Sequence, residues 1–176
     1  AYDLIDPLTQ QQVGLVRDEP AGSQKWLRLL VNKRFLSTTL NVYEQEGMPP
    51  VLTLRKHPGL LRVLVDVESP EHGSLGQFKS KLMTIGGGFF ILDMTGQPIG
   101  EVSGDWKGWN FQLRDAQGGE LGTVTKKWAG VGKELLTNAD NYMIALSDAG
   151  ASSPRQAALL LAAALAIDTV FKEKQG

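Results

Sequence analysis

The C-terminal end of the chain contains an apolar run that the rest of the sequence has to accommodate. All eleven residues from Ala157 to Ile167 are Ala, Leu or Ile, and most of these are strong helix formers. Ser153 and Pro154 suit the N-cap and the first helical position, and Lys172 suits the last turn. A helix that is apolar on every face is enclosed by protein or lies in lipid.

The length of this run favours enclosure by protein. A bilayer-spanning helix needs about 20 mostly apolar residues, whereas a run of about 10–14 is typical of a buried core helix. Asp168 interrupts the run, and a carboxylate there must be paired, capped by backbone groups or exposed at the mouth of the enclosure. Lys172, four residues later, is a suitable partner for Asp168. A transmembrane helix and a helix bound by a partner protein are the alternatives.

The composition is that of one globular domain. The chain has 176 residues, 42% hydrophobic and 21% charged, with a net charge of −1, so nothing drives it as a whole towards nucleic acid, and no nucleic-acid partner is expected. It has no cysteine, which excludes disulfides, thiolate metal sites and cysteine nucleophiles. We predict a single domain over residues 1–176, with strands in 1–149 and the helix over 153–173. No signal peptide is visible, and we expect a cytoplasmic protein that contacts membranes peripherally.

The middle of the chain contains an internal repeat. The pattern Phe-x-Ile/Leu-x-Asp-x-x-Gly-x-x-Ile/Leu-Gly-x-Val-x-x-x-Trp-x-Gly starts at Phe89 and again at Phe111. Its alternation predicts a strand, and Asp-x-x-Gly predicts a turn whose glycine takes a positive φ. Asp93 and Asp115 are therefore interpreted as turn residues. The glycine of the second strand predicts a bulge or a close approach. Fragments of that second strand recur at 13–16 and 75–78, which predicts a meander of hairpins.

These hairpins can enclose the apolar helix. Turn signals every ~8–12 residues indicate a sandwich or barrel, and about ten to twelve candidate strands can be marked. A barrel that holds a helix must be wider than one of about eight strands, which side chains fill. We therefore predict a mainly β fold, a closed antiparallel β-barrel around the C-terminal helix. Alanines keep this helix thin, and the larger core residues expected on it are Leu159, Leu160, Leu161, Leu165 and Ile167.

The last third of the chain contains three motifs in a specific order. They are Leu121-Gly122-x-Val124-x-Lys126-x-Trp128-x-Gly130, then Glu134-Leu135-x-Thr137-x-Ala139-Asp140-Asn141-Tyr142-x-Ile144, then the apolar helix that ends in Ile167-Asp168. In these motifs the chain resembles the phospholipid scramblase family and, more loosely, the wider group with the tubby C-terminal fold. The resemblance implies a barrel of about twelve strands around the helix. It also implies calcium-stimulated movement of phospholipids between leaflets, or phosphoinositide binding as in tubby-like relatives.

The resemblance also identifies a segment for calcium, which in the family is an acidic run that begins Asp-Ala-Asp-Asn-Phe. Its equivalent here runs from Asn138 to Ala149, and Asp140 is the one acid at an expected position. Calcium takes about six to eight oxygen ligands, so a site with Asn138 and Asp140 as ligands is doubtful. A turn role for Asp140 and Asn141 is favoured instead. No other cofactor is expected.

Lysines next to tryptophans are the candidates for a lipid headgroup site. Lys126 and Lys127 adjoin Trp128, and Trp106 and Lys107 stand at the matching place in the first copy of the repeat. A basic residue near an anionic leaflet contributes about 1 kcal/mol, and an amphipathic aromatic beside it suits the interface. A core role for the two tryptophans is the alternative.

No constellation of catalytic residues is found, and we expect no enzyme. His57 and His72 lie in turns without a patterned Ser or Asp partner, and Gly86 to Gly88 lack the lysine and Ser/Thr of a phosphate loop. The function predicted is non-covalent phospholipid binding or transbilayer movement, with an anionic phospholipid or phosphoinositide surface and an unidentified protein as partners. The alternative is a soluble interaction or scaffold domain that retains the fold.

Overall fold

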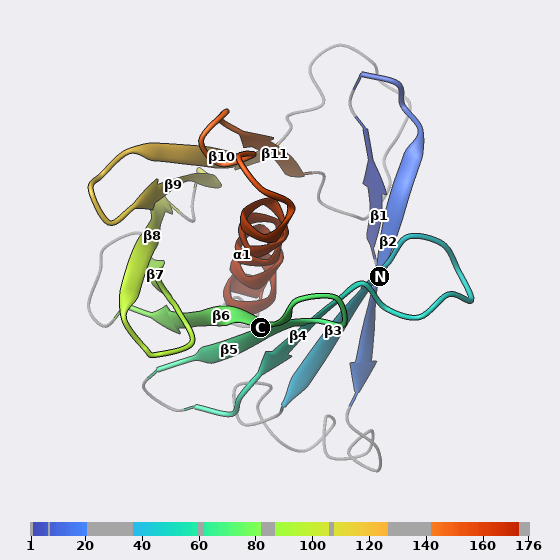
Figure 1. The fold of residues 1–176 in the computed structure, drawn as a ribbon, viewed down its shortest axis with the longest axis horizontal. Helices are drawn as coiled ribbons and strands as arrows, with labels where there is room; N and C mark the ends of the chain where they lie inside the picture. The colour runs from blue at the N-terminus through green and yellow to red at the C-terminus, as the bar shows by residue number, and fades with distance from the viewer. Residues whose placement is uncertain are drawn as a thin grey trace.

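The computed structural model describes residues 2–6, 8–20, 37–59, 62–81, 87–105, 108–126 and 142–172. Within these ranges the chain forms eleven strands and one helix, and the sheet curves around the helix (Figure 1). The elements are β1 (Tyr2–Ile5), β2 (Gln12–Pro20), β3 (Thr38–Tyr43), β4 (Leu52–Lys56), β5 (Leu64–Ser69), β6 (Gly73–Ser80), β7 (Gly88–Leu92), β8 (Pro98–Asp105), β9 (Asn110–Asp115), β10 (Glu120–Lys126), β11 (Tyr142–Leu146) and α1 (Pro154–Lys172).

The strands form one antiparallel sheet in the order of the sequence, from β1 to β11. The sheet therefore has two distinct ends. The hairpin turns after each odd-numbered strand up to β9 lie at one end, which we call the turn end. At the opposite end the even-numbered strands finish. α1 begins at the turn end, because it follows β11, and Arg155 Nη2 in its first turn bonds the backbone oxygen of Ser74 in the β5–β6 hairpin at 3.2 Å.

The prediction of a closed barrel is wrong. Among the described residues, hydrogen bonds pair β1 only with β2 and β11 only with β10, so they do not close the sheet. Eleven described strands stand in place of about twelve. The number explains the difference: directions alternate along the sheet, so the first and eleventh strands run the same way. An antiparallel closure requires an even number of strands.

The two copies of the repeat form two successive hairpins, β7–β8 and β9–β10, as predicted. In the first turn, Asp93 Oδ1 accepts hydrogen bonds from the backbone N–H groups of Thr95 at 2.8 Å and Gln97 at 3.0 Å. Asp115 makes the equivalent pair of bonds in the second turn. Gly96 has a φ of +81°, which only glycine adopts without cost. The interpretation of both aspartates as turn residues is confirmed.

The recurrent glycines lie directly after bulged residues. The register between strands shifts by one residue at the same place in β2, β6, β8 and β10. A Cβ on Gly76 would lie 2.4 Å from the backbone oxygen of Leu92 in the next strand, and one on Gly100 would lie 2.5 Å from that of Arg114. The bulge and the close approach that the pattern predicted are both present. Bulges bend a sheet, and four of them in register explain how this one curves around a helix.

α1 fills the interior of the curved sheet and contacts β4, β5, β6, β10 and β11. Large side chains of the strands, among them Phe78, Phe89 and Phe111, are fully buried in the same cluster. On the helix, Leu159, Leu160, Leu165 and Ile167 are buried, and Leu161 is partly exposed. Ala162 and Ala163 are 0% exposed, so the helix is thin where the sheet is nearest. Within the described residues, no helix has the length and hydropathy that crossing a bilayer requires.

Candidate functional site

Charged side chains are distributed unevenly between the two ends of the sheet. Exposed carboxylates lie in or beside the turns of the turn end: Asp6, Glu44, Glu46, Glu71, Asp115 and Asp148. The described basic residues that lie at the opposite end, which we call the basic end, are Arg55, Lys56, Arg62, Lys79, Lys81 and Lys126. Four carboxylates, of Asp18, Glu19, Asp66 and Asp105, are also found there. The excess of positive charge at the basic end is therefore modest, and the turn end is clearly acidic.

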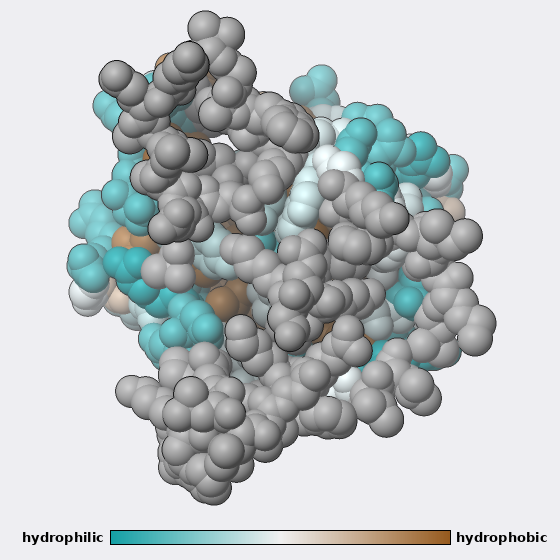
Figure 2. All heavy atoms as spheres, turned by 180° about the vertical axis from the view of Figure 1, so that it is seen from behind, coloured by the Kyte–Doolittle hydropathy of each residue, from teal (hydrophilic) through white to brown (hydrophobic). Residues whose placement is uncertain are grey.

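A cation lies on an exposed aromatic ring on the outer face of β6–β8. Lys81 Nζ is 4.9 Å from the centroid of the Phe90 ring and 2.5 Å from Glu101 Oε2. Lys79 stands opposite Phe90 in the register of β6 and β7. Phe90 is 40% exposed, although most outward positions in the sheet are polar, as the described surface in Figure 2 shows. An exposed ring flanked by two lysines suits contact with a lipid interface.

His57 has a carboxylate partner that the sequence pattern did not reveal. Its Nε2 is 2.5 Å from Asp66 Oδ2, across the β4–β5 pair, and Gln77 Nε2 donates to the other oxygen of Asp66 at 2.7 Å. The expectation that His57 lacks an Asp partner is therefore wrong. The expectation of a solvated histidine is confirmed, because half of its side chain is exposed.

The interior of the basic end contains buried polar groups. Lys56 points inward and is 2% exposed. It lines a cavity of about 10 Å³ with Thr38, Thr169 and four apolar residues, which is space for about one water molecule and too little for a lipid headgroup. Asp168 is 4% exposed and accepts a hydrogen bond from the Tyr2 hydroxyl. Tyr2 is a partner that sequence reasoning missed; the side chain of Lys172 lies outside the described residues.

Most of the predicted site residues lie outside the described part of the chain. These are Trp106, Lys107, Lys127, Trp128, Asn138 and Asp140; of Lys126 only the backbone is described. The structure does place the strand ends next to these segments side by side. Asn110 is paired with Asp105 on one side and Thr125 on the other, and Lys126 is paired with Tyr142. The lysine and tryptophan positions of both repeat copies therefore follow strands that finish together at the basic end.

Trp109 is an aromatic residue at this end that the sequence analysis passed over. It is 8% exposed and has a φ of +49°. Its ring lies 4.7 Å from that of Tyr142 and 6.1 Å from that of Phe111, edge-on to the latter. It packs under the start of β9 as part of the core. Its place outside the repeat pattern, between the two copies, was the signal that could have identified it.

The predicted calcium site is not covered by the described residues. Asn138 and Asp140 fall outside them, and Asp148, at the far end of that segment, is an exposed residue of the turn after β11. Among the residues that are described, no group of three or more His, Asp or Glu side chains is arranged to hold a metal ion.

Comparison with known proteins identifies the family. A family model described as Scramblase matches residues 61–174, a range that runs from just before β5 through both copies of the repeat and α1. No curated protein and no solved structure matches the chain. The matched range contains the hairpin repeat and the enclosed helix, and it spans well over half of the sequence. The chain belongs to the Scramblase family.

Proposed function

We propose that this protein binds anionic phospholipid headgroups non-covalently, through the basic end of its sheet. Membership of the Scramblase family supports a lipid-related function at the level of the family. The observation that carries the more specific proposal is the separation of charge: basic residues at strand ends face one way and the acidic hairpin turns face the other. An anionic surface attracts the first end and repels the second.

The outer face of β6–β8 supplies the described part of this surface. Lys79, Lys81 and Phe90 combine two cations with an exposed ring. Each lysine near an anionic leaflet contributes about 1 kcal/mol. Lys81 already contacts Glu101 at 2.5 Å, so a lipid phosphate has to compete with that carboxylate, and Lys79 is the more available of the two.

The proposed surface also includes Lys126, Lys127 and Trp128, with Lys107 and Trp106 from the other repeat copy. They follow strands that finish beside one another at the basic end. Membrane contact in this proposal is peripheral, since α1 is packed inside the sheet and its apolar residues are engaged with the strands. The proposal includes no covalent step, and no cofactor is required for binding.

Vesicle sedimentation tests the proposal. We expect the protein to pellet with vesicles of phosphatidylcholine and phosphatidylserine, or of phosphatidylcholine and a phosphoinositide, and to stay in solution with phosphatidylcholine alone. Binding should weaken with added salt, because exposed charges are screened beyond about 10 Å at 0.1 M. Absence of pelleting with every anionic composition would contradict the proposal.

Charge-reversal variants locate the binding surface. Lys79→Glu, and separately Lys127→Glu, should each weaken binding to anionic vesicles by about fivefold or more, from about 1 kcal/mol per basic residue. Arg114→Glu is the matched control: Arg114 is an exposed residue at the turn-end side of β9 and contacts Gln112 at 2.6 Å. It should leave binding unchanged, and an equal loss in this control would show that net charge alone governs binding.

The same vesicles separate binding from transbilayer movement. α1 is enclosed by the sheet, so it offers no path for headgroups through a bilayer. We expect the protein to bind anionic vesicles without accelerating the loss of inner-leaflet fluorescent lipid to an external quencher, with or without calcium. Acceleration that requires calcium would show that the family's transbilayer activity is present and would contradict simple binding.

A further inference from the structure

The two edge strands, β1 and β11, each have a hydrogen-bonded neighbour on one side only, within the described part of the chain. They run in the same direction, because ten alternations separate them along the sheet. A single strand antiparallel to both would therefore continue the pattern and join the two edges. Unpaired edges of this kind are templates for the backbone of another chain.

The inner sides of these two strands are less buried than those of the rest of the sheet. Inward-facing residues of interior strands, such as Val67 and Phe78, are 0% exposed. The inward-facing residues of the edge strands are only partly buried against the core: Tyr2, Leu4, Tyr142, Ile144 and Leu146. The core therefore extends to both edges without being fully covered there.

The helix shows the same incomplete cover on one stripe. Ala158 and Leu161 are partly buried, whereas Leu160, Ala162 and Ala163 are 0–1% exposed. Residues three apart lie on the same face of a helix, so Ala158 and Leu161 form one apolar stripe. In Figure 1, α1 lies inside the curve of the sheet whose two ends are β1 and β11. The stripe and the two strands together make an apolar lining with no charged side chain in it.

The backbone of β11 offers hydrogen-bonding groups on its open side. Ser147 N–H donates to Leu121 O at 3.0 Å, and Leu146 is paired with Gly122. Antiparallel pairs alternate between bonded and non-bonded positions, so Met143 and Ala145 direct their N–H and C=O groups to β10. Those of Ile144 and Leu146 point the other way, to the open edge.

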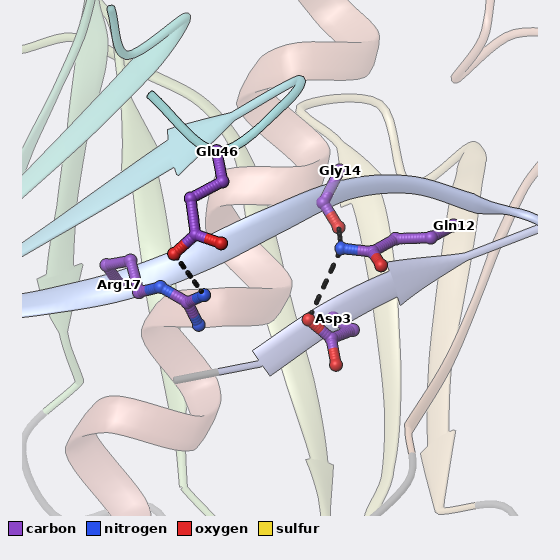
Figure 3. Close-up of polar contacts among 5 residues, drawn as sticks. All are labelled: Asp3, Gln12, Gly14, Arg17 and Glu46. Atoms are coloured by element: carbon purple, nitrogen blue, oxygen red, sulfur yellow. Dashed lines mark hydrogen bonds and ion pairs between the residues drawn. The ribbon is translucent and has the colours of Figure 1, made fainter. Parts of the chain in front are cut away.

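The charge on the outer side is negative. Asp3 is the one charged residue in β1 and β11 together, and Asp6 and Asp148 follow these strands at the turn end. The carboxylate of Asp3 is exposed, with Gln12 Nε2 3.4 Å from its Oδ1 (Figure 3). A strand that pairs here would place its apolar side chains on the α1 stripe and its outward side chains beside Asp3. Charge complementarity favours lysine or arginine at the outward positions.

We propose that β1 and β11 bind an extended segment of a partner protein in which apolar residues alternate with basic ones, antiparallel to both strands. This interaction is distinct from lipid binding at the basic end. The partner's backbone supplies hydrogen bonds to both edges, its apolar residues cover Leu161 and Ile144, and its cations face Asp3.

A short acetylated peptide of alternating lysine and valine is the probe, and calorimetric titration against the whole protein measures its affinity. Hydrogen exchange shows where it binds. We expect saturable binding and slower amide exchange in residues 2–5 and 142–146. A peptide of the same composition in two blocks, Lys residues first, should bind much more weakly because its side chains do not alternate. A peptide N-methylated at alternate residues should lose binding because it lacks the backbone donors.

One variant and its control test the charge argument. Asp3→Lys should weaken the lysine–valine peptide by about fivefold, as expected from the energy of one cross-strand pair. Glu44→Lys, which makes the same charge change at the β3–β4 turn, should have little effect. Equal binding of the block peptide would reduce the interaction to general electrostatics. No added protection in β1 and β11 would show that this chain covers its own edges. Either result would overturn the proposal.

Discussion

The Tyr2 hydroxyl donates a hydrogen bond to Asp168 Oδ2 and so connects the first strand of the sheet to the last turns of the enclosed helix. Asp168 is 4% exposed, and a buried carboxylate is costly unless it is hydrogen-bonded. The bond allows the carboxylate to lie inside the sheet, and it fastens β1, which has only one neighbouring strand, to α1.

Removal of the Tyr2 hydroxyl should destabilise the fold. Tyr2→Phe leaves a carboxylate oxygen of Asp168 without this donor, so we expect the free energy of unfolding to fall by about 1–3 kcal/mol, measured by urea denaturation. Tyr43→Phe is the control: its hydroxyl bonds the exposed Glu19 at 2.7 Å, and a surface change of this kind costs about 0.5 kcal/mol or less. Equal losses in the two variants would contradict a special role for the Tyr2 contact.

The glycine after each bulge should tolerate no side chain. In Gly100→Ala the new Cβ would lie 2.5 Å from the backbone oxygen of Arg114, so β8 and β9 would have to separate. We expect a loss of about 2 kcal/mol or more, within the upper range of single substitutions. Gly47→Ala has open space around it and a φ of +86°, and should cost only the about 1–2 kcal/mol of a left-handed backbone. A smaller loss at Gly100 than at Gly47 would contradict the close approach.

Features set by residues near one another in the chain could be predicted from the sequence. The repeat that starts at Phe89 and Phe111 gave both hairpins, because alternation and an Asp-x-x-Gly turn are local signals. The bulges followed from a recurrent glycine, as at Gly76 and Gly100. The apolar run gave the enclosed helix, because a helix of that length and composition has to be covered.

Features that depend on distant segments could not be predicted. The closure of the sheet is decided by whether β1 and β11 are adjacent, and neither strand carries a signal of its neighbour. Tyr2 and Asp168 meet only once the sheet has curved, and His57 meets Asp66 across a strand pair. The contact of Lys81 with Phe90 likewise depends on the register of β6 and β7. The headgroup residues that adjoin Trp128 stay a prediction.

The helix should tolerate added volume only on its partly exposed stripe. Ala163→Leu inserts a large side chain where the exposed fraction is 0%, and overpacking of this kind costs about 1–3 kcal/mol. Ala158→Leu adds the same atoms on the partly buried stripe and should be neutral or slightly stabilising. Thermal unfolding of the two variants, side by side, provides the measurement. Similar behaviour of both would mean that the helix is not packed more tightly on one side than on the other.

The first repeat turn should respond to acid in a defined direction. The hydroxyl of Thr95, followed by the backbone N–H of Gln97, lowers the pKa of Asp93 below its ordinary value. A lowered folded-state pKa stabilises the turn above about pH 4, and the stabilisation is lost as the pH falls through the folded-state pKa. Titration of the carboxyl carbon by NMR should give a low pKa for Asp93. Thr95→Ala should raise it towards the ordinary value; no change would show that the hydroxyl is not its cause.

Enclosure of α1 by the sheet is the central claim, and thiol labelling tests it most directly because the chain has no cysteine of its own. Ala163→Cys places a thiol where the exposed fraction is 0%, and Ala151→Cys places one at an exposed position before the helix. We expect a water-soluble maleimide to label Cys at 151 rapidly. Cys at 163 should be labelled only after unfolding, with and without anionic vesicles. Rapid labelling at 163 in the folded protein, or labelling there by a lipid-soluble maleimide once vesicles are added, would contradict the claim.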